Sequence, residues 1–229
     1  MNKAISTPIA IIIIVLLAIL VGGITAWQYG LFPEISYQKI HFPKSEIILE
    51  ELEDKTLEDK SNVKSIIEDR TIETMTAIKD KDEEKLSSLA HPNKGVRFSP
   101  YTYVILEDDL VFSADELSNF FEDENIYTWG TYDGSGFPID LTPSEYYDKI
   151  IYTADFLNAE QISYNRIIGK GNTINNTFEV YPDSIIVEYY FSGFDLNLEG
   201  FDWRSLRLVF EEKDNVWYLV GIINDHWTI

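Results

Sequence analysis

The feature that most constrains the fold is a pair of long segments, SLRLVFEE and VWYLVGII, separated by the tripeptide KDN. Within the first segment, Leu206, Leu208 and Phe210 alternate with other residues, which places them on one face of an extended strand. The tripeptide contains the residues that favour turns. The two segments therefore predict a long antiparallel β-hairpin, and any fold of this chain has to bury its apolar face.

Further strands and two helix starts are expected before this hairpin. Residues rich in β-branched and aromatic side chains predict strands at 96–104, 126–132, 137–141, 161–169, 177–181 and 185–191. In FSADEL, Ser113 and Glu116 have the spacing of a capping box, and Thr142 and Glu145 have it in LTPSEY. Each pair predicts that a helix begins at that point.

Helices are also expected at the start of the folded part. The period of an α-helix is roughly followed by Val63, Ile66, Ile67, Met75 and Ile78. Asp80, with Glu83 three residues later, is expected to cap a second short helix, which Pro92 ends. Helices followed by long antiparallel strands predict the α+β class, in which N-terminal helices pack on one side of a curved antiparallel sheet.

The beginning of the sequence predicts a membrane segment. Residues 4–33 include no charged residue, and residues 8–27 are almost entirely apolar. About 20 helical residues span roughly 30 Å, the thickness of a bilayer core. A cleaved signal peptide would have a shorter apolar region and a clear small-residue cleavage site. One uncleaved transmembrane helix is therefore the preferred interpretation.

This anchor predicts where the rest of the chain lies. Lys3 and the amino terminus are the cations before the apolar run, which favours a cytoplasmic N-terminus and an extracytoplasmic domain. The predicted organisation is a transmembrane signal-anchor at 1–30, an acidic linker at 31–60 and one folded domain at 61–229. The expected location is the cell membrane, which the chain crosses once.

Charge and cysteine content exclude several classes of function. The net charge is −21, from 39 acidic and 18 basic residues, so the chain repels nucleic acid and anionic lipid headgroups. It has no cysteine, which rules out disulfides, thiolate metal sites and cysteine catalysis. The loop DGSG lacks the length and the acidic positions of a calcium loop and is not followed by a phosphate-binding lysine. No cofactor and no metal site is predicted.

The order of these elements resembles the NTF2-like, or SnoaL-like, cone. The resemblance rests on the helix ending IKDKDEEKLSSLAHP, the segment GVRFS after it and the closing hairpin. It implies a pocket between sheet and helices, in a family that includes both enzymes and binding proteins.

Four strings are similar to uncharacterised exported proteins and lipoproteins of bacteria: HPNKGVRFSPY, GNTINNTFEVYPDSIIVEY, DWRSLRLVF and WYLVGIINDHWTI. This second resemblance implies an extracytoplasmic domain and carries no activity. Lipoprotein relatives would need an N-terminal cysteine, whereas here a membrane helix is expected to be the anchor.

Several cationic and aromatic residues are candidates for lining such a pocket. Arg97 in an expected strand could present its planar fork to a carboxylate, or pair with one of the many acids of this chain. Arg204 shares a strand face with Leu206, where an arginine needs an acidic partner, so we expect it to join a buried polar network or to bind a ligand. The candidate ligand-binding residues are Arg97, Tyr101, Tyr103, Trp129, Trp203, Arg204 and His226.

No catalytic residues are predicted. Asp225 and His226 are adjacent in an expected strand and so point to opposite faces. We therefore expect a binding module for a small molecule or an envelope protein, held at the membrane by its N-terminal helix. One alternative is a hydrolase or isomerase with a polar pocket built from Arg97, Tyr103, Arg204 and His226. Another is a structural envelope protein whose acidic face binds divalent cations.

Overall fold

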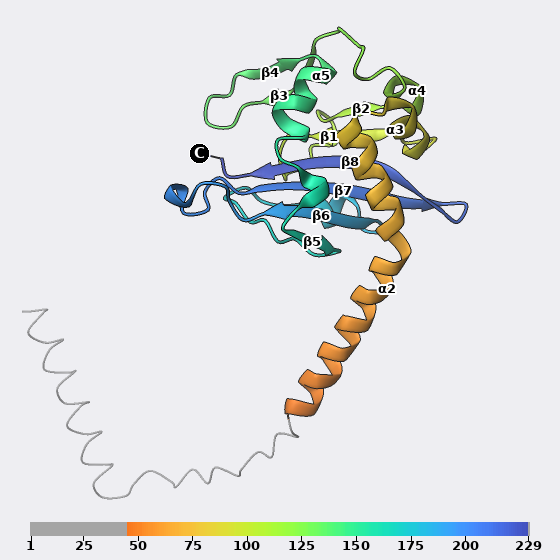
Figure 1. The fold of residues 1–229 in the computed structure, drawn as a ribbon, viewed down its shortest axis with the longest axis vertical. Coiled ribbons are helices and arrows are strands. Elements are labelled where there is room, and N and C mark those ends of the chain that lie inside the picture. Colours follow the sequence, from red (N-terminus) through yellow and green to blue (C-terminus); the bar gives the residue numbers. More distant parts are fainter. Residues whose placement is uncertain (1–44, 229) are drawn as a thin grey trace, which may run out of the picture. The chain divides into compact units, whose positions relative to one another are not determined.

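The computed structural model describes the backbone of residues 45–228 and the side chains of residues 62–228 (Figure 1). Glu50–Ile229 forms one compact unit, built around a six-stranded sheet. The predicted anchor at 1–30 and the first part of the predicted linker lie outside the described residues. The extracytoplasmic location depends on that anchor and stays a prediction.

The sheet has the strand order β2-β1-β8-β7-β6-β5. Its strands are β1 (Val96–Ser99), β2 (Leu110–Phe112), β5 (Gln161–Tyr164), β6 (Ile185–Phe191), β7 (Arg204–Lys213) and β8 (Val216–His226). β1 pairs in parallel with β8, and the other neighbouring pairs are antiparallel. β8 therefore lies in the interior of the sheet, between β1 and β7.

The predicted hairpin is confirmed in β7 and β8. Lys213 pairs with Val216, so the turn contains two residues, Asp214 and Asn215. Their φ angles are 54° and 62°, and a two-residue turn with both φ values positive matches the right-handed twist of the flanking strands. Asp and Asn tolerate this conformation better than most residues do.

Between residue 45 and the sheet the chain forms two helices, α2 (Ser45–Asp80) and α3 (Glu83–Leu89). The predicted apolar spacing is confirmed for Ile67, Met75 and Ile78, which are buried in the core, but Ile66 is 47% exposed. α3 is capped by Asp82 rather than by Asp80, because α2 continues through Asp80 and the Asp82 carboxylate accepts the Lys85 amide at 2.9 Å. α2 also runs without a break across residue 61, where the sequence predicts the folded domain to begin.

Both predicted capping boxes are confirmed. The Ser113 hydroxyl accepts the Glu116 amide at 3.3 Å, and the Glu116 carboxylate accepts the Ser113 amide at 2.7 Å. Thr142 and Glu145 form the same pair of hydrogen bonds. The short helices and turns are α4 (Ala114–Leu117), α5 (Pro143–Tyr146), a π-helical turn η1 (Tyr147–Ile151), η2 (Phe156–Asn158), α6 (Thr177–Val180) and η3 (Leu196–Leu198).

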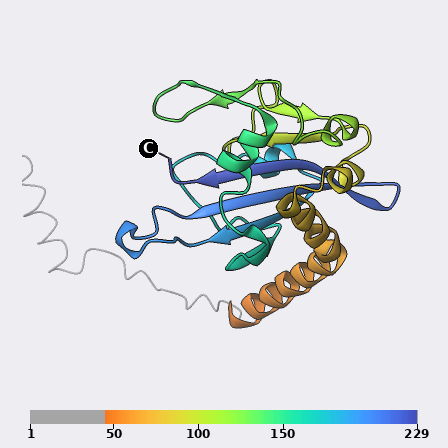
Figure 2. The same cartoon turned by 45° about the horizontal axis from the view of Figure 1, so that its top comes forward.

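One face of the sheet is covered by an aromatic core. The hairpin of β3 (Tyr127–Thr131) and β4 (Pro138–Leu141) lies beside the β1–β2 end of the sheet, together with α5 (Figures 1 and 2). It contributes Trp129, which is fully buried and stacks on Tyr146 with 3.8 Å between ring centroids. Phe98, Phe112 and Phe120 pack around the same indole. Side chains thus fill the space between this face and its covering elements.

The opposite face of the sheet is buried as well. A second cluster of buried residues joins Val104 and Tyr181, which lie outside the strands, to Ile186, Val209, Val220 and Ile223 of β6, β7 and β8. Ile167 and Val180 pack against this cluster. The segments around residues 104, 167 and 181 therefore form a cover of loops and one helical turn.

The predicted fold class is wrong on two points. The sheet is mixed rather than antiparallel, because β1 is parallel to β8. Both faces are covered, whereas the predicted cone has its helices on one side. No helix between residues 45 and 228 combines the length and apolar character needed to cross a membrane, and the segment predicted to do so lies outside this range. The alternation of apolar and polar residues predicts where strands occur. It does not predict whether two strands pair in parallel, because that depends on how the chain between them connects their ends.

Some local predictions also need correction. Residues 177–181 form α6 instead of a strand, since a short apolar run does not distinguish helix from strand. β1 ends at Ser99, because Pro100 has no amide to continue the pairing. β5 ends at Tyr164, well before the predicted end at Gly169. β2 was absent from the sequence prediction.

Candidate functional site

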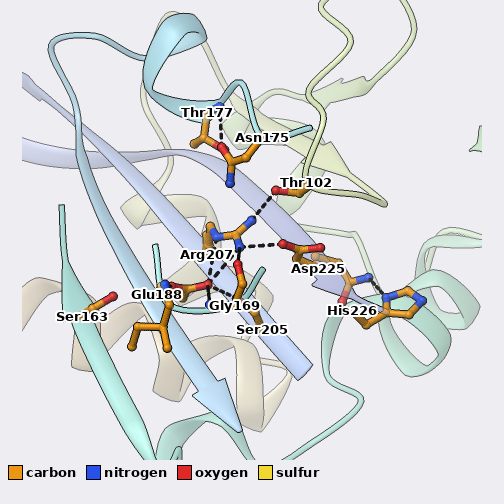
Figure 3. Close-up of polar contacts among 12 residues, drawn as sticks. Thr102, Ser163, Gly169, Asn175, Thr177, Glu188, Ser205, Arg207, Asp225 and His226 are labelled. Carbon is orange, nitrogen blue, oxygen red and sulfur yellow. Dashed lines mark hydrogen bonds and ion pairs between the residues drawn. The ribbon is translucent and has the colours of Figure 1, made fainter. Parts of the chain in front are cut away.

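A buried ion-pair network occupies the second face of the sheet, centred on Arg207 of β7 (Figure 3). Arg207 is fully buried and lies directly opposite Glu188 of β6. Its Nη2 donates to Glu188 Oε1 at 2.9 Å and to Asp225 Oδ2 of β8 at 2.6 Å. Its Nε donates to Glu188 Oε1 at 3.1 Å, and its Nη1 to the Thr102 hydroxyl at 2.6 Å. The three strands and the loop with Thr102 are thus joined through one guanidinium.

Glu188 is the most heavily bonded carboxylate of this network. Besides Arg207, it accepts the Ser205 hydroxyl at 2.6 Å, the Gly169 amide at 3.2 Å and the Ile168 amide. Two backbone amides and a hydroxyl compensate the charge of a side chain that is fully buried. The network therefore fixes the loop around Gly169 to the sheet.

Asp225 is less well compensated. Its pKa is raised, mainly by burial, although the Arg207 charge and hydrogen bonds from Arg207 and Thr102 act in the opposite direction. Each nitrogen of the Arg207 guanidinium donates at least one hydrogen bond to the protein, and the side chain is fully buried. We interpret the network as structural.

The sequence predicts a buried network at Arg204, and the structure places it at Arg207. Alternation is confirmed, because Leu206, Leu208 and Phe210 face the aromatic core and Arg207 faces the other way. The prediction assumes that only one face of the sheet is buried. The usable signals are Glu188 within IIVEYY and Asp225 within GIINDH, two acids inside otherwise apolar strands.

An open groove lies near the predicted site, between the 100–109 loop and the β3–β4 hairpin. It consists of two adjoining hollows of about 420 and 490 Å³, which share Tyr101, Tyr103, Ile105 and Thr131. Tyr132 extends it along the hairpin loop. Tyr103 is 46% exposed and Tyr132 39% exposed, so their rings are available to a partner. We call this surface the tyrosine groove.

The tyrosine groove is acidic. Its lining includes Glu107, Asp108, Asp109 and Asp133, and none of its described lining residues is basic. Asp109 differs from the other three, because it is buried and accepts the Ser99 hydroxyl and the Ile105 amide. Burial raises its pKa, against the effect of these hydrogen bonds and of Arg97. The exposed charges at the groove are therefore those of the other three carboxylates.

Tyr101 lines both hollows of the groove and is hydrogen-bonded to the hairpin. Its hydroxyl accepts the Asp133 amide at 3.0 Å, which ties the loop before β2 to the hairpin. Burial raises the pKa of this hydroxyl although that hydrogen bond lowers it, so Tyr101 remains neutral at physiological pH. Its ring lies 6.0 Å from the His226 ring, measured between centroids.

His226 is a neutral neighbour of the groove. Its Nδ1 lies 2.9 Å from the Asn224 side-chain nitrogen, which donates to it if Nδ1 is unprotonated. Burial lowers the His226 pKa, and the Arg204 charge lowers it further. Asp225 points away toward Arg207, as the alternation of a strand requires.

The remaining predicted site residues are spread over other surfaces. Trp129 belongs to the aromatic core, where its Nε1 donates to the Leu141 carbonyl at 2.9 Å. Trp203 is buried against Gly169, and Arg204 is half-buried and donates to the carbonyls of Asp202 and Trp203, each at 3.1 Å. Arg97 lines a separate hollow. Among the predicted residues, the structure brings together Tyr101, Tyr103 and His226.

The acidic surfaces bear on the alternative of an envelope protein that binds divalent cations. Across the part of the chain that the structure describes, no three His, Asp or Glu side chains are grouped so that they could hold a metal ion.

No family model matches the chain, and no curated protein or solved structure matches it. The resemblance to exported bacterial proteins and lipoproteins stays a prediction, and function has to be inferred from geometry.

Proposed function

We propose that this domain is a binding module whose tyrosine groove holds a cationic segment of a partner protein. The observation that carries the proposal is the composition of the groove, with Tyr101, Tyr103 and Tyr132 beside exposed carboxylates and no basic residue among its described lining. Lysine and arginine side chains are attracted to the faces of aromatic rings and to carboxylates. The groove offers both kinds of contact along one surface.

The net charge of the chain supports the same class of partner. A charge of −21 raises the local concentration of cationic molecules and speeds their encounter with the surface. It equally disfavours an acidic partner. The groove adds the short-range contacts that would select one cationic segment from others.

A chain segment fits the groove better than an enclosed small molecule does. Sites for small molecules usually surround most of the ligand, whereas Tyr103 and Ile105 stay 46% and 40% exposed. The two hollows follow one another and share a wall, which suits an extended peptide.

Binding also accounts for the groove better than catalysis does. General acid–base catalysis needs a group that is poised near the working pH and free to reach the substrate. Asp109, the groove carboxyl with a raised pKa, is engaged by Ser99 and Ile105. The residues of the alternative enzyme pocket, Arg97, Arg204, Tyr103 and His226, do not line a common hollow.

Isothermal titration with short synthetic peptides tests this proposal. A peptide of alternating lysine and glycine is expected to bind, and its glutamate counterpart is expected not to. Replacing Tyr103 by alanine should weaken binding of the lysine peptide by a factor of about 2 to 30, since a cation–π contact contributes about 0.5–2 kcal/mol. Phe178→Ala is the control, because Phe178 is similarly exposed, at 42%, but lies outside the groove.

A second pair of variants separates the groove from the general charge of the molecule. Asp108→Asn and Glu124→Gln each remove one exposed negative charge, but only Asp108 lines the groove. We expect Asp108→Asn to weaken binding by a factor at least two larger than Glu124→Gln does. Equal effects of the two variants, or equal binding of the two peptides, would contradict the proposal.

A further inference from the structure

A second hollow borders the 100–109 loop at Leu106 and has a different chemistry. Its volume is about 320 Å³, and its cationic side chains are Lys94 and Arg97. Leu106, Val111, Val180 and Val220 supply apolar walls, and Tyr181 and Glu211 complete the lining. We call it the arginine hollow. It shares no lining residue with the tyrosine groove.

Arg97 is anchored on one side and free on the other. Its Nη1 donates to the carbonyls of Leu106 and Asp109, at 3.1 and 2.8 Å. Among the described residues, Nε and Nη2 have no hydrogen-bond partner. An arginine fixed by one nitrogen keeps its planar guanidinium in place, with two donors available in the fork geometry that matches a carboxylate.

Tyr181, which lies close to Arg97, provides a second sign of a missing partner. The side chain is only 8% exposed, yet its hydroxyl forms no hydrogen bond within the described structure. Gly221, the strand partner of Arg97, leaves room for this hydroxyl, since a Cβ there would lie 3.3 Å from it. Buried hydroxyls nearly always have a partner. Burial raises the Tyr181 pKa to about 12, while the charge of Arg97 and its closeness to this hydroxyl oppose the shift, so the hydroxyl keeps its proton and can donate.

The neighbouring charges leave Arg97 able to attract an anion. Lys94 and Glu211 form an ion pair with each other, so neither adds a net charge at the hollow. Asp109 lies close to Arg97, but its carboxylate is engaged by Ser99 and Ile105, and Arg97 contacts its carbonyl oxygen instead. Arg97 is therefore the cation of this hollow that has unused donors.

We propose that the arginine hollow binds a monocarboxylate with a short aliphatic chain. The free donors of Arg97 and the Tyr181 hydroxyl would hold the carboxylate, and the chain would lie against Leu106, Val111, Val180 and Val220. This combination of one cationic fork with apolar walls selects against dianions and against neutral polar molecules, which would leave the fork or the walls unmatched. The site is distinct from the tyrosine groove and does not depend on the function proposed for it.

Titration with hexanoate tests this site, with hexanamide as a neutral probe of almost the same shape. Chemical shift changes in amide NMR spectra of the protein give both affinities. We expect hexanoate to bind at least tenfold more tightly than hexanamide, because only the carboxylate can form charge-assisted hydrogen bonds with Arg97. Binding of hexanamide as tight as that of hexanoate, or no binding of either at millimolar concentration, would overturn the proposal.

Tyr181→Phe is the sharpest variant, because it removes a hydroxyl that has no partner in the free protein. The melting temperature should stay the same or rise, while hexanoate affinity should fall about fivefold or more. Tyr190→Phe, at a half-buried tyrosine away from the hollow, should leave hexanoate affinity unchanged. An unchanged affinity in Tyr181→Phe would refute the assigned role.

Arg97→Lys keeps the charge but loses the planar fork, and we expect it to weaken hexanoate binding about tenfold. Arg97 also donates to two loop carbonyls, so the Arg97→Lys variant could lose stability as well as affinity. The melting temperature of Arg97→Lys is therefore compared with that of Tyr181→Phe. Binding of the lysine peptide should be unchanged in Tyr181→Phe. Failure at one site can thus be distinguished from failure at the other.

Discussion

Arg207 is the residue on which the second face of the sheet depends. It is fully buried between two carboxylates, Glu188 and Asp225. A buried ion pair adds little to stability compared with apolar residues of the same volume, but removing one partner leaves an uncompensated charge in the interior. The three members of the network are therefore expected to differ in how much each substitution costs.

Replacing Arg207 by methionine should lower the free energy of unfolding by about 3–5 kcal/mol, because two buried carboxylates lose their counterion. Asp225→Asn should cost much less, roughly 1 kcal/mol, since Glu188 keeps its pairing and one buried charge is removed. Urea unfolding followed by tryptophan fluorescence measures both. Arg166→Met at an exposed arginine is the control; a loss for Arg207→Met no larger than for this control would contradict the expectation.

Residue-level prediction from the sequence succeeds where the decisive interaction is local. Ser113 and Glu116 cap their helix through contacts three residues apart, and sequence spacing contains that information. Arg207 meets Glu188 and Asp225 across strand registers, which no local pattern encodes. The same limit explains why Arg97 and Tyr101 were predicted for one pocket, although the structure places them at different hollows.

Among the elements, the β1–β2 pair depends on one glycine. Gly95 has a φ of +66°, and a Cβ there would lie 2.3 Å from the Phe112 carbonyl oxygen. Phe112 is paired with Val96 in the sheet, so its backbone is not free to move away. Gly136, in the β3–β4 turn, has a similar φ of +69° with nothing within 4 Å of its Cβ position. Gly95 and Gly136 therefore share a left-handed backbone conformation, but only at Gly95 does another part of the backbone lie too close for a Cβ atom.

Gly136→Ala should therefore destabilise the fold by about 1–2 kcal/mol, the cost of a left-handed alanine. Gly95→Ala should cost about 1–3 kcal/mol more, because the backbone clash adds to the same conformational term. Thermal or urea unfolding of the two variants gives the difference. If both variants unfold alike, the close approach at Gly95 is not a constraint.

The elements show the same division between local and long-range information. The hairpin of β7 and β8 was predictable, because its two strands and its turn are contiguous. The parallel pairing of β1 with β8 was not, because it joins residues far apart and depends on the covering elements between them. The cover over the second face was missed because its loops lack periodicity.

For the molecule as a whole, two histidines link stability to pH. Burial lowers the pKa of both His91 and His226 below 6.5. The folded state thus favours their neutral forms, and the unfolded chain takes up protons first as the pH falls. Their contribution to stability is fully present above pH 6.5 and is lost as the pH falls through the two folded-state pKa values.

Unfolding free energies measured in urea between pH 7.5 and pH 5 check this linkage. The loss of stability on acidification should be smaller in the double variant His91→Asn/His226→Asn than in the unmodified chain. Asparagine at position 91 can still accept the Asn93 and Lys94 amides that His91 Nδ1 accepts. Asp109 and Asp225 have raised pKa values, so their effect on the dependence of stability on pH has the opposite sign. Both residues are present in the variant and in the unmodified chain, so their effects cancel in the comparison. Parallel pH profiles would contradict the linkage.

The position of β8 in the sheet has a consequence for synthesis on the ribosome. Phe98 of β1 pairs with Ile222 of β8. β1 and β2 therefore cannot join the main sheet until β8, about 120 residues later in the sequence, has been translated. At roughly 5–20 residues per second, this delay is about 6–24 s. During that time the nascent chain exposes unpaired strand edges and the apolar side chains of the unfinished aromatic core. Chaperone protection of this interval, rather than the stability of the finished sheet, is then expected to limit the yield of folded protein.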